Sequence, residues 1–62
     1  MTERLLVSVR EAAQILGLAR DRTYELVRSG ELRSLSVGRK RLVPRMELEA
    51  WIERSLAAEE TP

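Results

Sequence analysis

Arginine side chains are the groups of this sequence best suited to bind another molecule, and they are concentrated in the middle of the chain. Each guanidinium is a planar fork of N–H donors that can bond two neighbouring acceptors at once, on a carboxylate, a phosphate or a base edge. Residues 20 to 30 carry Arg20, Arg22 and Arg28, together with Tyr24 and Glu25. This composition indicates a segment that binds an anionic partner or one rich in hydrogen-bond acceptors.

A second group of cations follows a glycine, in the run Gly38, Arg39, Lys40, Arg41. Three adjacent cations repel one another, and folding gains nothing from gathering them unless an anion neutralises the cluster. A polyanion such as a nucleic acid would do so, and a solubilising loop is the alternative.

The net charge of +1 conceals a strong division of charge along the chain. From residue 20 to residue 45, eight cations stand against three anions, whereas after Arg45 the one cation is Arg54 among five glutamates. A basic middle on an otherwise neutral domain is typical of a polyanion-binding surface. Solvated charge placed for solubility remains the alternative.

The length and composition weigh against an enzyme. A chain of 62 residues has room for one thin core and buries only roughly 60% of its unfolded surface. It has no cysteine and no histidine, so the usual zinc ligands and the commonest general base are missing. Tyr24 could attack a phosphodiester only within a preorganised array of cations that so small a fold cannot hold. We expect no catalysis, no cofactor and no metal.

The N-terminus, MTERLLVSV, is too short and too polar for a signal peptide, and no apolar run approaches the roughly 20 residues that a membrane span needs. The absence of cysteine fits a reducing compartment. The sequence therefore predicts a cytoplasmic protein that makes no contact with a membrane.

The first helix is predicted from its ends. Ser8 stands three residues before Glu11, which is the spacing of a capping box, so the helix should begin near Val9. Gly17 suits the left-handed residue that ends a helix. The packing face should be formed by Ala12, Ala13, Ile15 and Leu16.

The second helix should run from Arg20 to Gly30, with Thr23, Leu26 and Val27 on its packing face. Ala19, at its cap position, cannot accept a hydrogen bond from the first-turn amides, so this start is weaker than the first. Two helices separated by about three residues, with glycine opening the turn, have helix-turn-helix spacing. An ordinary antiparallel helical hairpin is the alternative.

The hydrophobic period changes to two after residue 31. Apolar and polar residues alternate from Leu35 to Val37, as in a strand, and Gly38 to Lys40 supplies a turn. A second strand follows from Arg41 to Val43 and ends at Pro44, which has no N–H donor to extend the ladder. This predicts a β-hairpin with a cationic tip. Because an isolated hairpin is marginal in water, its apolar face should lie on the helices.

A third, amphipathic helix should run from Arg45 to Ala58, with a frayed tail over residues 58–62. Trp51, the largest side chain available, should pack in the core rather than stack on a ligand. The remaining apolar positions of its face are Leu48, Ile52 and Leu56.

These elements predict one domain over residues 1–62, mainly α with a small β-hairpin: a winged helix-turn-helix of about three helices and a two-stranded wing. The partner expected for such a surface is double-stranded DNA, read in the major groove by the second helix and touched on the backbone or in the minor groove by the hairpin. The candidate contact residues are Arg20, Arg22, Tyr24, Glu25, Arg28, Arg39, Lys40 and Arg41.

Roles can be assigned to the candidates by their chemistry. Arg20, Arg22 and Arg28 are guanine readers or phosphate clamps. Glu25 either accepts from a cytosine amino group or holds Arg22 or Arg28 through a pair three residues apart. Tyr24 is expected to bond a phosphate through its hydroxyl.

The series SVREAAQILGLARDRTYELVRSGEL followed by SVGRKRLVPRMELEAWIE resembles the excisionase-type winged helix-turn-helix domains, relatives of the MerR DNA-binding domain. The resemblance implies a recombination directionality factor of a phage or mobile element in a bacterial cell, which binds and bends attachment-site DNA and steers an integrase toward excision. A small transcriptional regulator with the same domain is the alternative. Ala19, Glu25, Arg33 and Leu42 depart from the common pattern of the family.

A single reader of this size covers few base pairs. The sequence therefore predicts cooperative self-association on repeated sites about one helical turn apart, roughly 10 to 10.5 base pairs. A protein-interaction module with an incidental basic patch would show no such binding.

Overall fold

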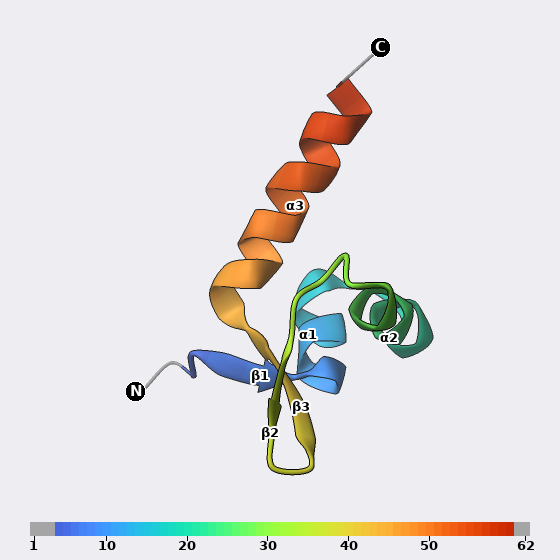
Figure 1. Ribbon diagram of the computed structural model, residues 1–62. Coiled ribbons are helices and arrows are strands. Elements are labelled where there is room, and N and C mark those ends of the chain that lie inside the picture. Colours follow the sequence, from blue (N-terminus) through green and yellow to red (C-terminus); the bar gives the residue numbers. More distant parts are fainter. Residues whose placement is uncertain (1–3, 61–62) are drawn as a thin grey trace.

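Three helices and three short strands make up the fold within residues 4–60, the part of the chain that the computed structural model describes (Figure 1). The arrangement is the predicted one, a mainly helical winged helix-turn-helix. In chain order the elements are β1 Leu6–Ser8, α1 Val9–Leu16, α2 Arg20–Ser29, β2 Leu35–Val37, β3 Lys40–Pro44 and α3 Arg45–Glu60.

Helix α1 begins and ends as its sequence predicts. The Ser8 hydroxyl accepts from the Glu11 amide at 3.0 Å, and the Glu11 carboxylate accepts from the Ser8 amide at 3.1 Å, which completes the capping box. Gly17 ends the helix with φ 75°, a conformation that costs glycine least. Ala12 and Ala13 are buried, but Ile15 is half-exposed. The prediction that Ile15 packs in the core was wrong, because an open hollow, lined by Ile15 and by Leu48 and Ile52, lies between the end of α1 and helix α3.

Helix α2 has a packed face and a charged face. Thr23 and Leu26 are buried, and Val27 packs against the core from the edge. Ala19 makes no side-chain cap, as expected, and Gly30 ends the helix with φ 88°. The buried Thr23 hydroxyl donates to the Ala19 carbonyl at 3.0 Å. A polar side chain on the packing face is thereby satisfied.

The strands form one antiparallel sheet in the order β1-β3-β2. The hairpin of β2 and β3 was predicted, whereas the pairing of β1 with β3 was not. Val7 lies opposite Val43 in the β1–β3 register, and both side chains are buried. Strand β1 extends the hairpin to a three-stranded sheet, which is more stable in water than an isolated two-stranded hairpin.

We use the name wing for residues 35–44, which comprise β2, its turn and β3. Gly38 and Arg39 form a two-residue turn between Val37 and Lys40. Gly38 has φ 63° and Arg39 has a negative φ, the sign pattern of a type II′ turn, which matches the twist of paired strands. Figure 1 shows the turn at the free end of the wing, away from the helices.

The apolar face of the wing packs only at its base. Val43 is fully buried, but Leu35 and Val37 are half-exposed. Leu35 pairs with Leu42, which lies on the face opposite to Val43 because side chains alternate along a strand. The prediction that this apolar face lies on the helices was therefore wrong for Leu35 and Val37.

Helix α3 packs through its first turns and then projects away from the remaining elements (Figure 1). Leu48 is buried and Trp51 packs against the core from the edge, so Trp51 lies at the border of the core, not at its centre. Ile52 and Leu56 are exposed, against expectation; Ile52 borders an open hollow that Ile15 and Leu16 of α1 also line. The helix continues to Glu60, beyond the predicted end at Ala58, and residues 61 and 62 of the predicted frayed tail lie outside the described residues.

Among residues 4–60, none of the helices has the length and apolar character that a membrane span requires.

The core is small and joins all the layers. The buried cluster consists of Val7, Val9, Ala12, Leu26, Leu32, Val43 and Leu48. It includes Leu26 of α2 and Val43 at the base of the wing, and so fixes both elements on one support.

Candidate nucleic-acid interface

The five candidate residues of α2 are all exposed and divide into two stripes. Arg20, Tyr24 and Arg28 recur every four residues and form one stripe, whereas Arg22 and Glu25 form a second. Val27, three residues after Tyr24, lines a hollow between α2 and the wing. The first stripe therefore borders the wing, and the second lies on the far flank of the helix.

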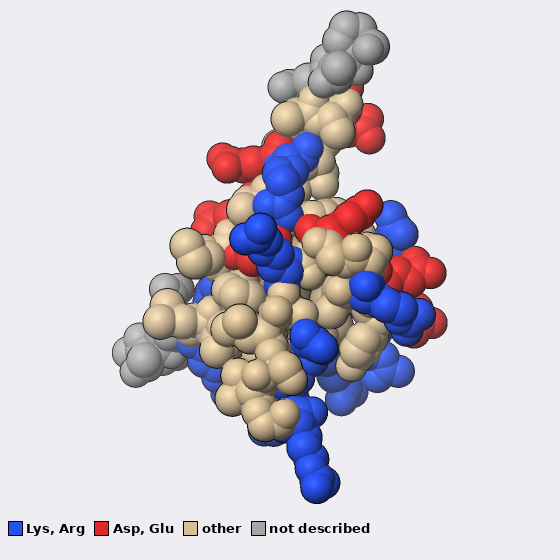
Figure 2. All heavy atoms as spheres, in the orientation of Figure 1, with Lys and Arg blue, Asp and Glu red and all other residues tan. Residues whose placement is uncertain are grey.

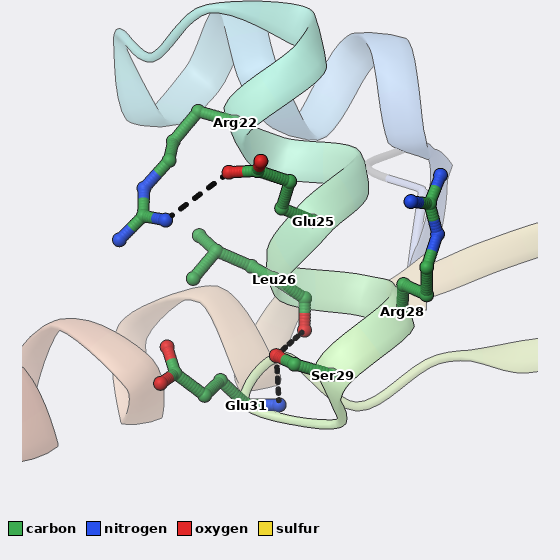
Figure 3. Close-up of a pocket in the computed structure, with 6 residues that line it drawn as sticks. All are labelled: Arg22, Glu25, Leu26, Arg28, Ser29 and Glu31. Carbon is green, nitrogen blue, oxygen red and sulfur yellow. Dashed lines mark hydrogen bonds and ion pairs between the residues drawn. The ribbon is translucent and has the colours of Figure 1, made fainter.

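Arg22 and Glu25 form an ion pair, with Nη1 of Arg22 lying 3.3 Å from Oε1 of Glu25. Figure 3 shows the two side chains pointing toward each other, while Arg28 extends from another side of the helix. The sequence offered Arg22 and Arg28 as partners for Glu25, and in the structure Arg22 forms the ion pair. Both side chains are well exposed, so the pair stabilises the fold little and a competing anion could open it.

Tyr24 lies at the border of the charged face and is 45% exposed. This partial exposure agrees with a residue that positions a ligand through a phosphate. On the other stripe, Ser29 turns its hydroxyl inward, donating to the Leu26 carbonyl at 3.2 Å and accepting from the Glu31 amide at 3.4 Å (Figure 3).

The wing presents its cations at the turn and on the strand that follows it. Arg39 lies in the turn, and Lys40 begins β3 opposite Val37. Arg41 lies on the same face as Val43, which is the face toward the helices, and its Nη1 donates to the Ser34 hydroxyl at 3.4 Å. Figure 2 shows basic side chains reaching the free end of the wing and acidic side chains along α3.

The hollow between α2 and the wing has a volume of about 590 Å³. It lies between α2 and the wing, and of the candidate residues Arg41 lines it. Arg33 and Ser34, which were not among the candidates, also line it; their position in the basic segment was the one available signal for them. The lining residues are Val27, Gly30, Leu32, Arg33, Ser34, Leu35, Arg41 and Pro44.

A buried carboxylate holds the connection between α2 and the wing. Glu47 is 8% exposed, and its Oε2 accepts from the Arg33 amide at 3.1 Å and from Nη2 of Arg54 at 2.8 Å. The same Arg54 nitrogen donates to the Glu31 carbonyl at 2.9 Å. We call this arrangement the Glu47–Arg54 clamp. The clamp was not predicted, because Glu47 and the Arg33 amide lie 14 positions apart and meet only in the folded chain.

The ionisation of Glu47 follows from these contacts. Burial raises the pKa of its carboxyl group, but the hydrogen bonds donated by the Arg33 amide and by Arg54, with the charges of both arginines, outweigh burial. The pKa of Glu47 therefore lies below its usual range, and the carboxylate is charged at neutral pH.

Residues 6–55 match the family described as "Helix-turn-helix domain". The chain is also similar to a protein of Saccharopolyspora erythraea described as "Probable excisionase", with 44% identity over 57 residues. The match covers 92% of this chain and 58% of that protein, so the chain spans little more than half the length of this curated relative. No solved structure matches the chain.

Proposed function

This chain belongs to the helix-turn-helix domain family, and we propose that it binds double-stranded DNA with α2 in the major groove and the wing against the adjacent backbone or minor groove. The observation that carries the proposal is that one hollow, lined by Val27 of α2 and by Arg33 and Arg41 of the basic segment that follows, lies between the exposed face of α2 and the wing. A single duplex can then meet both surfaces at once.

The two stripes of α2 suit a helix lying in a groove. Arg20, Tyr24 and Arg28, on the wing side, lie toward one wall of the groove, and Arg22 with Glu25 lies toward the other. Arginine can bond guanine O6 and N7 together, and the tyrosine hydroxyl can bond a phosphate. In this arrangement Glu25 holds Arg22 in position until a base or phosphate competes for it.

The wing supplies contacts that depend little on sequence. Arg39 and Lys40 lie at its free end, where minor-groove potential or phosphate charge attracts them. Arg41, on the helix side, lines the hollow. In the proposed complex it contacts phosphates of the DNA backbone that passes between α2 and the wing. Neutralisation of these phosphates gives the binding its salt dependence.

The biological role that best fits the chain is that of an excisionase, a recombination directionality factor. The similarity to a probable excisionase supports it. In this role several copies bind repeated attachment-site sequences, bend the DNA, and steer an integrase toward excision in the cytoplasm of a bacterial or phage-infected cell. The domain acts by binding and does not catalyse strand exchange itself.

A gel-shift and bending assay on the attachment region of the mobile element tests this role. We expect cooperative binding to tandem sites, bending, and an increased yield of excision when the integrase is present. Binding to one isolated operator, with no effect on the integrase, would favour a small transcriptional regulator instead. Absence of binding at low salt would reject the DNA-binding function altogether.

A further inference from the structure

The Glu47–Arg54 clamp ties α3 to the segment that connects the two proposed DNA-contacting elements. Residues 30–34 join the end of α2 to the start of β2. The clamp fixes this connection at two backbone points, the Arg33 amide and the Glu31 carbonyl. The path between α2 and the wing is therefore set by side chains of a third element.

The hydrogen bonds continue from the clamp to the wing. Arg33, whose amide bonds Glu47, precedes Ser34, and the Ser34 hydroxyl accepts from Arg41 of β3. A series of contacts thus runs from α3 through the connection to a cation that faces the hollow. A shift of the connection would move Ser34 and change the position available to Arg41.

We propose that Glu47 and Arg54 are positioning residues for DNA binding, which hold the connection so that α2 and the wing engage one duplex together. This inference rests on the proposed function. Neither residue needs to touch DNA. Glu47 is buried and accepts hydrogen bonds from the Arg33 amide and from Arg54. Arg54 also donates to the Glu31 carbonyl of the connection.

The composition of the clamp favours positioning over simple stabilisation. Glu47 is buried while Arg54 is half-exposed, so the carboxylate loses its hydration and the ion pair offsets part of that cost rather than adding much net stability. It does, however, select one geometry, since each donor must meet its acceptor. Arg54 is also the one cation after Arg45, in a segment with five glutamates, and it is directed to this site rather than to the exposed acidic side chains around it.

Two substitutions with opposite effects on net charge test the inference. Glu47→Gln removes a negative charge and raises the net charge by one, whereas Arg54→Gln removes a positive charge and lowers the net charge by one. If only long-range electrostatics mattered, the first variant would bind DNA more tightly and the second more weakly. Positioning predicts that both variants bind specific DNA more weakly, by about fivefold or more, because loss of simultaneous engagement removes the gain from linked contacts.

The salt dependence gives a second readout. If the wing no longer meets the duplex together with α2, fewer phosphates are neutralised, and the slope of log affinity against log salt should become shallower by about one to two units in both variants. Glu49→Gln is the matched control, because Glu49 is exposed on the same helix and its substitution makes the same charge change as Glu47→Gln. We expect Glu49→Gln to bind as tightly as wild type or slightly more tightly.

Binding is compared at a temperature where circular dichroism shows each variant to be folded, so that a loss of stability does not lower the measured affinity. Arg54 is half-exposed, so its substitution leaves no buried cavity and decides the question if Glu47→Gln does not fold. Unchanged affinity and slope in the folded variants, or changes of opposite sign that follow net charge, overturn the inference.

Amide hydrogen exchange tests the clamp without DNA. The Arg33 amide should exchange faster in Glu47→Gln than in wild type, because its acceptor is weakened, and an unchanged rate would overturn the inference. If wild type itself does not bind DNA, the proposed function fails, and this exchange measurement still decides whether Glu47 holds the connection.

Discussion

Nη1 of Arg22 lies 3.3 Å from Oε1 of Glu25 on the flank of α2 away from the wing. The pair couples a potential base-reading cation to an anion that DNA would repel. Binding through Arg22 therefore has to replace the Glu25 contact by a base edge or a phosphate.

Arg22→Ala should reduce discrimination between the specific site and random DNA. We expect a loss of about 1–3 kcal/mol on the specific site and a much smaller loss on random sequence, as for a bidentate base contact. Competition gel shifts with both DNAs measure the two affinities. Equal losses on the two DNAs would show that Arg22 contacts phosphate and does not read a base.

Glu25→Gln is the counterpart on the same ion pair. It removes a negative charge from the proposed interface and releases Arg22, so affinity for all DNA should rise by several-fold at low salt, an effect on the order of 1 kcal/mol. The same competition assay measures it. A loss of affinity confined to the specific site would instead mean that Glu25 accepts a hydrogen bond from a cytosine.

Arg39→Ala and Lys40→Ala should weaken binding to specific and random DNA alike, because the free end of the wing meets backbone or minor groove and not a base-specific edge. Each should reduce the salt slope by about one. Titrations at several salt concentrations give the slopes. A wild-type slope in both variants would place the wing away from the duplex.

Local signals in the sequence predicted the parts of the fold that depend on neighbouring residues. The Ser8–Glu11 capping box and the helix ends at Gly17 and Gly30 were correct, because each depends on residues within one turn. The pairing of Val7 with Val43 was missed, because it joins segments far apart in the chain, and a strand of three residues has too little periodicity to reveal a partner.

The same limit applies to α3 and to the candidate site. Periodicity grouped Leu48, Ile52 and Leu56 on one face, but it could not show that Leu48 is buried while Ile52 and Leu56 remain exposed. Likewise the exposed charges of α2 and the wing followed from pattern, whereas the Glu47 contact with the Arg33 amide joins residues 14 positions apart and follows only from the fold.

Stability should fall in acid. Hydrogen bonding to the Ser8 amide lowers the pKa of Glu11 against a smaller effect of desolvation, and the pKa of Glu47 is also lowered, each from a usual value of 4.5. A lowered folded-state pKa contributes stability above the unfolded value and loses it as pH falls through the folded value. Urea unfolding between pH 7 and pH 3 should show constant stability at the upper end and a decline below about pH 4.5.

Glu47→Gln separates the two carboxylates in that experiment, because glutamine does not titrate. The variant should be less stable than wild type at pH 7, and its stability should fall less between pH 7 and pH 3. A fall as steep as that of wild type would assign the acid sensitivity to Glu11 and other groups, not to the clamp.

Ala19→Ser should stabilise the protein by supplying the cap that α2 lacks. The backbone at Ala19 is already extended, with φ −65° and ψ 147°, and Ala19 makes no side-chain hydrogen bond to the helix. A serine hydroxyl there could accept from the Asp21 or Arg22 amide, a contact typically worth about 0.5–2 kcal/mol. Thermal or urea unfolding measures the gain. Ala19→Val is the control, since it adds volume at an exposed position but no acceptor, and should give no gain. Equal stability of the serine and valine variants would mean that water already satisfies the first-turn amides.

If the weak start leaves the first turn of α2 partly disordered in the free protein, Ala19→Ser should also tighten DNA binding slightly, because less conformational entropy is lost when the helix binds the duplex.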